Sequence, residues 1–448
     1  MKTVGNAREL ALGVEAIVGA GHLITEPGAQ RRFLQDFSWY SPMLTEALAG
    51  VSVDVVAQPS DLEELREVLG LAVRLRVPVT VRGAGTGNYG QSVPLAGGLL
   101  IDTRRLDRIV AVDATSITIE AGAVFDDVEA AALAKGRELR LMPTTRHLAT
   151  VAGFIGGGWG GIGSVAYGNL RDRNVLALDL YTLEDPPQRR HLEGDDVNVV
   201  VHTYGTVGVI TQVRLPTEPA RTWKSVFAAF DSLEGAARFA WKIALDASIR
   251  KRLLTLQEAP LPSMFLPVKS LFARGESVVL LMVDEESVER AGEVARSVDG
   301  SLKGWPERPM PAITEFTWAH TILWSKKHAK TSTWLQLGYS TDPDRFFEQT
   351  RAVKAKFGAD VLCHLEYMAL PTKGGAIAQG GHVIMDSSSE FLDAVSEFCK
   401  GIGVHVMNPH SFVVQEGGLV GQIDPVRLYK RGSDPFDLLN RGKLGTSA

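Results

Sequence analysis

The stretch Arg82–Gln91, which reads RGAGTGNYGQ, follows the apolar run VPVTV and combines four glycines with hydroxyl and amide side chains. Glycine has no Cβ atom to hold an anion away from the backbone, and it tolerates positive φ. Successive backbone N–H groups in such a loop can therefore contact a diphosphate. The loop predicts a nucleotide-cofactor site whose contacts come from the backbone of Gly83, Ala84, Gly85, Thr86 and Gly87, the side chain of Asn88, and Gln91.

The elements around this loop argue against a Rossmann site, although Gly85, Gly87 and Gly90 satisfy the G-x-G-x-x-G spacing. A Rossmann site needs a helix that opens at the third glycine and faces the pyrophosphate. Here Pro94 and two glycines come next, and the chain enters another apolar strand, LLIDT. A helix is predicted before the loop instead, over residues 61–76, because apolar residues recur there at helical spacing. This order does not fit NAD.

Three further blocks carry motifs in addition to the glycine loop. They are TVAGFIGGGWGGIGSVAYG (150–168), YGTVGVITQVRL (204–215) and DPFDLLNRGKL (434–444). Together with the loop, and in this order, they resemble the FAD-binding vanillyl-alcohol oxidase and p-cresol methylhydroxylase (PCMH-type) superfamily. The flavin-binding part looks most like the glycolate and D-lactate dehydrogenase branch. Arg441 stands where the closing motif of the superfamily usually has a proline. The resemblance covers almost the whole chain and implies FAD as the cofactor.

The resemblance also implies an α+β fold. It consists of a two-subdomain PCMH-type FAD-binding domain and an antiparallel-sheet substrate cap with helices on one face. Two stretches of the expected cap each read as a strand, an acidic turn and a helix, a pattern typical of such a sheet. The expected organisation is a helical lead-in over residues 1–50, the FAD-binding domain over 51–219, the cap over 220–429, and a tail over 430–448 that returns to the FAD domain.

Further FAD contacts are implied residue by residue. Small and hydroxyl-bearing residues of the second block and the segment before it are expected along the ribityl chain and the flavin ring. The third block and the tail are expected to add others. The full set is Pro143, Thr144, Thr150, Gly153, Gly157 and Gly160, then Gly208, Val209 and Ile210, then Asn440 and Lys443. Thr86 occupies the position where tethered relatives carry a histidine, and the second block has no cysteine, so FAD is expected to bind non-covalently.

Candidate catalytic residues lie in the cap. His410 follows an Asn-Pro turn, and a histidine titrates near neutral pH, as a general base must. In the run CHLEYM, strand alternation places His364 and Glu366 on one face. A lone histidine beside an apolar strand is more often structural, and a His–carboxylate pair can also bind a metal. The spacing here matches no fixed metal motif, so no metal site is predicted.

Candidate substrate contacts are Trp318, Tyr339, Tyr367 and Arg171. The cap is rich in aromatic residues between positions 305 and 339, which mostly fill cores but can also line an apolar pocket for an aromatic alcohol, a phenol or a bulky hydroxy acid. Arg171 suits a substrate carboxylate or a structural acid. The cap lacks the H-x-G-D-G-N-x-H and E-H-G strings of the resembled branch, which argues against a metal-assisted 2-hydroxy acid mechanism.

The predicted function is that of an FAD-dependent oxidoreductase. It oxidises an alcohol or a 2-hydroxy acid by hydride transfer to flavin N5. Two alternatives stay open: a phenol or aromatic-alcohol oxidase similar to vanillyl-alcohol oxidase, and a non-catalytic or electron-transfer subunit of a multi-subunit dehydrogenase. The expected partners are a small-molecule substrate and an electron acceptor, which is oxygen, a quinone or a redox protein. The resemblance also allows a homodimer.

Composition agrees with these expectations. A chain of 448 residues with 45% hydrophobic residues is too large for one ordinary core and predicts two or three domains. A net charge of −5 argues against nucleic acid as a partner. No stretch approaches a membrane span, and the N-terminus lacks the apolar core of a signal peptide. The two cysteines, Cys363 and Cys399, suit a reducing compartment, so a cytoplasmic location is expected.

Overall fold

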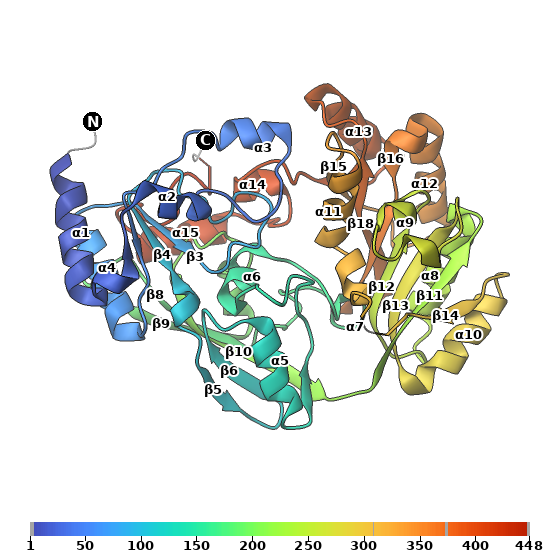
Figure 1. The fold of residues 1–448 in the computed structure, drawn as a ribbon, viewed down its shortest axis with the longest axis horizontal. Coiled ribbons are helices and arrows are strands. Elements are labelled where there is room, and N and C mark those ends of the chain that lie inside the picture. Colours follow the sequence, from blue (N-terminus) through green and yellow to red (C-terminus); the bar gives the residue numbers. More distant parts are fainter. Residues whose placement is uncertain (1–3, 308, 372–374, 446–448) are drawn as a thin grey trace.

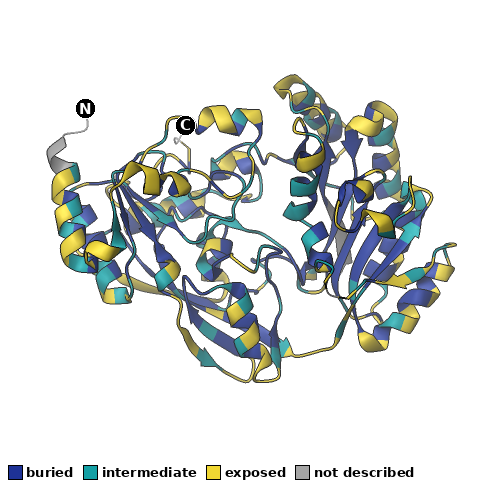
Figure 2. Cartoon of the chain, in the orientation of Figure 1, coloured by how far each residue is buried: buried dark blue, intermediate teal, exposed yellow. Residues whose placement is uncertain are grey.

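The computed structural model describes residues 4–307, 309–371 and 375–445. Figure 1 shows two lobes. The N-terminal half of the chain and the C-terminal tail form one lobe, and the yellow-to-orange part of the chain forms the other. Strands and the inward faces of the helices are buried in both lobes (Figure 2). None of the described helices is both long and apolar enough to cross a membrane. The α+β fold is confirmed.

The first sheet has the order β1-β2-β4-β3, and β2, β4 and β3 run parallel. Its strands are β1 (Leu23–Ile24), β2 (Val55–Ala57), β3 (Val79–Arg82) and β4 (Leu99–Asp102), and its helices are α1 (Val4–Val18), α2 (Pro27–Gln30), α3 (Pro42–Ala47) and α4 (Leu62–Arg74). Helix α4 begins at Asp61, whose carboxylate accepts two backbone N–H bonds. It buries Leu65 and Leu69 in one core with Leu10 and Val14 of α1. The predicted order of helix, strand, glycine loop and strand is confirmed.

The second sheet is antiparallel, with the order β5-β6-β10-β8-β9 and with β7 paired to β10. Its strands are β5 (Ile109–Val112), β6 (Ser116–Glu120), β7 (Arg137–Leu139), β8 (Ala177–Tyr181), β9 (Arg189–Glu193) and β10 (Val209–Pro219), and the helices are α5 (Phe125–Leu133), α6 (Val151–Gly157) and α7 (Ser164–Tyr167). Phe125 and Phe154 meet edge to face between α5 and α6, with ring centroids 5.4 Å apart. This contact fixes α6 over the sheet.

The third sheet belongs to the cap and is antiparallel, with the order β14-β11-β13-β12-β17-β18-β15-β19 and with β16 beside β18. Its strands are β11 (Trp223–Phe230), β12 (Lys251–Gln257), β13 (Ser277–Asp284), β14 (Leu302–Gly304), β15 (Thr333–Gly338), β16 (Val361–Leu362), β17 (His364–Leu370), β18 (Gly375–Ile384) and β19 (His405–Met407). Every pairing within it is antiparallel, as the sequence predicts.

Helices cover both faces of this sheet unequally. The helices are α8 (Leu233–Leu245), α9 (Leu261–Met264), α10 (Val288–Arg296), α11 (Ala319–His328), α12 (Pro343–Phe357) and α13 (Ser389–Gly401). Helices α8, α10, α12 and α13 lie on the outer face, where Trp241 and Phe346 pack edge to face. Helices α9 and α11 lie on the inner face with Phe265 and Phe316. The expectation of helices on one face therefore holds for α8, α10, α12 and α13 and is wrong for α9 and α11, which cover part of the face that borders the cavity.

Several contacts join the lobes. The N–H of Gly163, just before α7, donates to the carbonyl of Arg252 in β12 over 2.7 Å. The buried guanidinium of Arg252 donates to the Glu129 carboxylate of α5 over 2.7 Å. The tail contains α14 (Val414–Gly417) and α15 (Asp424–Ser433), and it returns to the first lobe, where Leu439 forms a parallel bridge with Val79. These contacts bring the cap, the tail and the glycine loop together.

Candidate cofactor and substrate site

A cavity lies between the glycine loop, the second and third blocks, and the inner face of the cap sheet. It encloses about 1640 Å³ of empty space, including its open mouth. The predicted cofactor residues that line it are Gly83, Ala84, Gly85, Thr86, Gly87, Asn88, Gln91, Pro143, Thr144, Thr150, Gly153, Gly157, Gly160, Gly208 and Ile210.

The first half of the glycine loop is built for an anion. Among the described residues, the backbone N–H groups of residues 83–87 donate to no protein acceptor. A Cβ atom on Gly83 would lie 2.0 Å from Thr150 Oγ1, and one on Gly85, whose φ is +67°, would lie 2.0 Å from the Arg82 guanidinium. Side chains therefore do not fit here, and the free N–H groups are available to phosphate oxygens.

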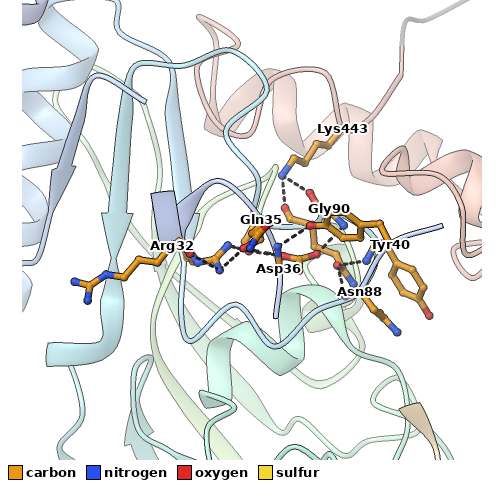
Figure 3. A network of polar contacts seen from close by, with 11 residues as sticks. Arg32, Gln35, Asp36, Tyr40, Asn88, Gly90 and Lys443 are labelled. Atoms are coloured by element: carbon orange, nitrogen blue, oxygen red, sulfur yellow. Dashed lines mark hydrogen bonds and ion pairs between the residues drawn. The ribbon is translucent and has the colours of Figure 1, made fainter. Parts of the chain in front are cut away.

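The second half of the loop is braced from outside the cavity (Figure 3). The Asp36 carboxylate accepts the N–H of Gly90 over 2.7 Å and the hydroxyl of Ser92 over 3.1 Å. Arg82 lies 3.8 Å from the same carboxylate and donates to the carbonyl of Gln35 over 2.7 Å. Residues 35 and 36 of the lead-in segment thus hold the glycine loop in place through these contacts.

Gln91 shapes the loop through its side-chain amide. Its Oε1 accepts the N–H of Tyr89 over 2.8 Å and that of Asn88 over 3.2 Å, and its Nε2 donates to the carbonyl of Gly157 over 3.2 Å. Because these two loop N–H groups are already bonded, the anion-binding donors end at Gly87. Gln91 also ties the glycine loop to the end of α6.

Lys443 and Asn440 lie behind the cavity wall and do not line it. Lys443 is fully buried, and its ammonium donates to the carbonyls of Gly90 and Gln91. Burial lowers the pKa of Lys443 to about 7, against the opposing attraction of the Asp36 carboxylate. The side-chain amide of Asn440 donates to the carbonyl of Tyr204. Both tail residues were predicted as flavin contacts. In the structure their side chains instead donate hydrogen bonds to backbone carbonyls of the glycine loop and of Tyr204, which form the cavity wall.

Val209 is also outside the cavity. It is fully buried in the core of the first sheet, because successive residues of β10 point to opposite sides. Its neighbours Gly208 and Ile210 line the cavity instead. The prediction for residues 208–210 was thus correct in position along the chain and wrong about the face on which the middle side chain lies.

The second block supplies a buried hydroxyl without a partner. Thr150 precedes α6, is 1% exposed, and its Oγ1 has no hydrogen-bond partner among the described residues. It faces the cavity between Gly83 and Gly153, where a Cβ atom would lie 2.0 and 2.7 Å from it respectively. A buried hydroxyl requires a partner, and a polar ligand in the cavity supplies one. Free N–H donors, this hydroxyl and the lack of space for side chains fit a dinucleotide cofactor.

His202 and Tyr204 line the cavity and were not predicted. His202 donates its Nδ1–H to the carbonyl of Gly158 over 2.8 Å, and its Nε2 lies 3.4 Å from the Tyr204 hydroxyl. Burial lowers the pKa of His202 to about 4, so the imidazole is neutral at neutral pH. The two residues have φ values of 59° and 55°, in the left-handed region. Tyr204 is the first residue of the third block, whereas no sequence motif marks His202.

The cap contributes a carboxylate–imidazole pair from β17. His364 Nε2 lies 3.0 Å from Glu366 Oε1, and both side chains line the cavity. Burial raises the pKa of Glu366, and the neighbouring His364 opposes that shift. Cys363, Leu365 and Tyr367 belong to the core on the opposite face. The predicted alternation of side chains along this strand is confirmed.

His410, the other predicted base, does not line the cavity. Its Nε2–H donates to the carbonyl of Trp334 over 2.8 Å, and burial lowers the pKa of His410 to about 4. Trp334 lies in the cavity wall and stacks on Tyr89 with ring centroids 5.5 Å apart. His410 therefore supports a wall residue from behind, and its predicted contact with the substrate is not supported by this position.

Of the predicted substrate residues, only Trp318 lines the cavity. Arg171 donates to the carbonyls of Asn198 and Val201 over 3.1 and 3.2 Å, so it holds a turn of the second subdomain. The Tyr339 hydroxyl lies 3.0 Å from His382 Nε2 in the outer core of the cap. Tyr367 packs edge to face on Trp241 in the same core. These three side chains are structural because they face away from the cavity.

Metal ligands do not gather in the described part of the chain. No group of three or more His, Cys, Asp and Glu side chains there has a geometry that could hold a metal ion.

Comparison with known proteins gives the same result as the geometry. Residues 53–185 match the model of a family described as FAD binding domain. A glycolate oxidase subunit of Bacillus subtilis (strain 168) is 27% identical over 196 residues, which are 41% of this chain and 41% of that protein. A D-2-hydroxyglutarate dehydrogenase of Xanthomonas citri pv. viticola is 27% identical over 251 residues, 53% of this chain and 51% of that protein. The chain spans about half or less of the length of these curated relatives.

Solved structures show the same fold over nearly the whole chain. A crystal structure of p-cresol methylhydroxylase with substrate bound has a TM-score of 0.70 at 12% identity and covers 98% of this chain and 97% of that one. A structure of alkyldihydroxyacetonephosphate synthase has a TM-score of 0.70 at 14% identity and covers 98% and 86%. Fold, site and family match define a flavin-binding protein. Residues 53–185 form an FAD-binding domain, and the cofactor of the chain is FAD.

Proposed function

We propose that this protein is an FAD-dependent oxidoreductase that oxidises the CH–OH group of an alcohol or a 2-hydroxy acid. The observation that carries the proposal is the buried Glu366–His364 pair, which faces the same cavity as the glycine loop. The relatives named above as a glycolate oxidase subunit and a D-2-hydroxyglutarate dehydrogenase support the reaction class. Non-covalent binding is supported by Thr86, which lines the cavity at the position where tethered relatives carry a histidine.

The residues divide the work between holding the cofactor and moving a proton. The N–H groups of residues 83–87 would hold the pyrophosphate, and Thr150 would donate to or accept from the cofactor. When bound, FAD accepts a hydride from the substrate carbon at N5. The substrate hydroxyl lies against Glu366 and His364, and the pair takes its proton as general base. Trp318 and Trp334 exclude water from that end of the cavity.

A pH profile follows from the raised pKa of Glu366. Glu366 must be deprotonated to accept the hydroxyl proton, so substrate oxidation should increase as pH rises through the pKa of Glu366. Because burial raises that pKa, the increase should occur at higher pH than for an exposed glutamate.

Replacement of Glu366 by Gln tests the assignment. Loss of a general base typically slows a reaction by about 10²–10⁴-fold, so we expect flavin reduction by substrate to slow by about a hundredfold or more, with FAD still bound. The measurement is anaerobic bleaching of the flavin absorbance in rapid mixing, with a panel of alcohols and 2-hydroxy acids. His405→Gln is the matched control, because His405 is exposed on β19 and does not line the cavity. Equal slowing by both variants, or unchanged kinetics in Glu366→Gln, contradicts the proposal.

A second candidate function is favoured by one observation. A matched relative is named as a subunit of glycolate oxidase, so it acts within a larger assembly. In that case this chain would pass electrons from reduced FAD to a partner protein. The alternative electron acceptors are oxygen and a quinone. Reoxidation of the reduced protein in air, within seconds at the rate of an oxidase, would count against the subunit role.

A further inference from the structure

The side chains that the cap places around the cavity are mainly apolar. Among the described residues, the cap side chains that line it besides the Glu366–His364 pair are Trp318, Ala319, Ile322, Trp334, Gln336 and Met407. All but Gln336 are aromatic, aliphatic or thioether groups. Trp334 is held rigidly, since it stacks on Tyr89 and its carbonyl accepts a hydrogen bond from His410. A wall of this kind favours an apolar substrate body fixed by a small number of polar contacts.

The described residues satisfy the pair only in part: the backbone N–H of Trp318 donates to the Glu366 carboxylate. Glu366 is 5% exposed and His364 is 1% exposed, and among the described residues Glu366 Oε1 and both ring nitrogens of His364 make no well-formed hydrogen bond. Their 3.0 Å contact is an ion-pair distance with poor hydrogen-bond geometry. Buried polar atoms of this kind require a ligand group that can both donate and accept. A hydroxyl does both, whereas a carboxylate only accepts.

The positive charges near the cavity are already engaged. Arg82 donates to backbone carbonyls and to the Ser92 hydroxyl, Lys443 donates to the carbonyls of the glycine loop, and Arg171 donates to those of residues 198 and 201. Within the described ranges, no arginine or lysine side chain lines the cavity. A substrate carboxylate would leave water without gaining a counter-ion and would lie near the Glu366 carboxylate.

We propose that the substrate is an uncharged alcohol with an aromatic or aliphatic body, and that the site discriminates against 2-hydroxy acids. This inference rests on the proposed function. In the oxidation, the alcohol carbon loses its hydride to FAD, the hydroxyl proton passes to the Glu366–His364 pair, and a carbonyl product forms. FAD gains the two electrons that the alcohol loses. The discrimination arises because the cap places tryptophan side chains and the Glu366 carboxylate, and no cation from the described residues, beside the group next to the reacting carbon.

A matched ligand pair tests the inference on the FAD-loaded protein. 1-Phenyl-1,2-ethanediol and mandelate, each as separate enantiomers, differ mainly in CH₂OH against COO⁻ next to the reacting carbon. Binding is measured by the increase in thermal unfolding temperature with ligand concentration, which does not depend on turnover. A repulsion large enough to shift a pKa by one unit corresponds to about tenfold in affinity, so the diol should bind at least about tenfold more tightly than mandelate at pH 7. Mandelate binding that equals or exceeds diol binding, or no diol binding, overturns the inference.

The same titration distinguishes this inference from the proposed function. Anaerobic flavin absorbance is recorded for each ligand. If the diol binds preferentially and bleaches the flavin, both proposals are supported. If the diol binds preferentially and no member of an alcohol panel bleaches the flavin, the preference for uncharged ligands stands and the oxidoreductase proposal fails. If mandelate binds and bleaches as well as the diol, the oxidoreductase proposal stands and the inference fails.

A charge introduced into the cap wall provides an independent test. Gln336→Arg places a cation beside the cavity, and Gln336→Met is its uncharged control of similar length. Among the described residues, the side chain of Gln336 makes one hydrogen bond, a long one of 3.5 Å to the Tyr89 hydroxyl, so little is lost on replacement. We expect the arginine variant to bind mandelate about tenfold more tightly than the methionine variant does. Equal mandelate affinity in the two variants would show that charge does not set the preference.

Discussion

One wall of the cavity is formed mainly by backbone atoms, and the other is formed mainly by side chains. The cofactor wall consists of glycine backbone, with free N–H groups over residues 83–87 and no space for a Cβ atom at Gly83. The cap wall consists of side chains, with Trp318, Trp334 and the Glu366–His364 pair. A backbone wall is determined by local sequence, because positive φ and absent side chains belong to glycine itself. A side-chain wall depends on which face of each strand turns inward.

This difference teaches where each wall is sensitive to change. The cofactor wall has no space for a Cβ atom at Gly83 or Gly85, and its position is fixed by buried partners such as Asp36, Arg82 and Lys443. The cap wall can exchange side chains of similar volume at the cost of altered specificity. Substitutions in the first wall should therefore abolish cofactor binding, and substitutions in the second should change substrate and rate.

The largest effect is expected from Gly83→Val. The Cβ atom alone would lie 2.0 Å from Thr150 Oγ1, and the branched methyl groups would enter the space of the cofactor. We expect the purified variant to retain no FAD and to show a dissociation constant raised by at least about a hundredfold, because overpacking of this kind costs about 1–3 kcal/mol before the lost anion contacts are counted. The measurement is the ratio of flavin to protein absorbance, followed by titration with FAD.

Gly304→Val is the matched control for this comparison. Gly304 lies in β14 at the edge of the cap, and no heavy atom lies within 4 Å of the position that a Cβ atom would take there. This variant should keep FAD and unfold at nearly the same temperature as the unaltered protein. Full FAD retention by Gly83→Val would show that the backbone wall is not the cofactor site.

An intermediate effect is expected on the free energy of unfolding when the pH is lowered from 7.5 to 5. Burial lowers the pKa of His202 from its ordinary value of 6.5 to about 4. Between these values the unfolded chain binds a proton that the folded chain does not, so the stability from this residue is complete above pH 6.5 and is lost as pH falls toward 4. The loss is about 2 kcal/mol at pH 5. Urea unfolding at pH 7.5 and pH 5, with FAD in excess, measures it.

His202→Gln should reduce that pH dependence by about the same amount, since glutamine does not titrate. The exposed His405 provides the control, because His405→Gln should leave the difference between pH 7.5 and pH 5 unchanged. The variant His410→Gln extends the comparison to the cap wall, where burial also lowers the histidine pKa to about 4. A pH dependence that survives intact in both buried-histidine variants would contradict the prediction.

The smallest effect is expected from Lys443→Met. The variant removes two hydrogen bonds to the carbonyls of Gly90 and Gln91 and also removes a buried charge, so stability should change little. The loosened loop should bind FAD about tenfold more weakly, equivalent to about 1.4 kcal/mol. Titration of the apoprotein with FAD measures the change. An unchanged dissociation constant would mean that the loop holds its conformation without the tail.

The sequence predicted well those features that depend on neighbours along the chain. The glycine loop, α4 before it and β4 after it could be read because helical periodicity and glycine content are local. His364 and Glu366 were found because side chains alternate along any strand. Val209 was placed with the wrong face inward, because the same alternation applies to β10 and the sequence does not say which parity faces the ligand.

Other residues could not be placed without the fold. His410 follows an Asn-Pro turn, as a catalytic histidine could. In the fold, however, the chain after β19 directs the His410 ring toward the carbonyl of Trp334. Arg171 directly follows a cofactor block, yet it donates to carbonyls of residues 198 and 201. His202 gave no signal, because its role depends on a left-handed backbone and on Gly158, which lies 44 residues earlier.

The sequence by itself determined the cofactor, the order of the elements and the backbone chemistry of the phosphate site, because four motifs and the φ preferences of glycine are properties of the chain. Tertiary structure alone decided which polar side chains line the cavity. A side chain enters the cavity only where the packing of the cap sheet against α7 and the tail turns it inward. Long-range packing therefore selected Glu366 and His364 and left His410, Arg171 and Tyr339 as supports.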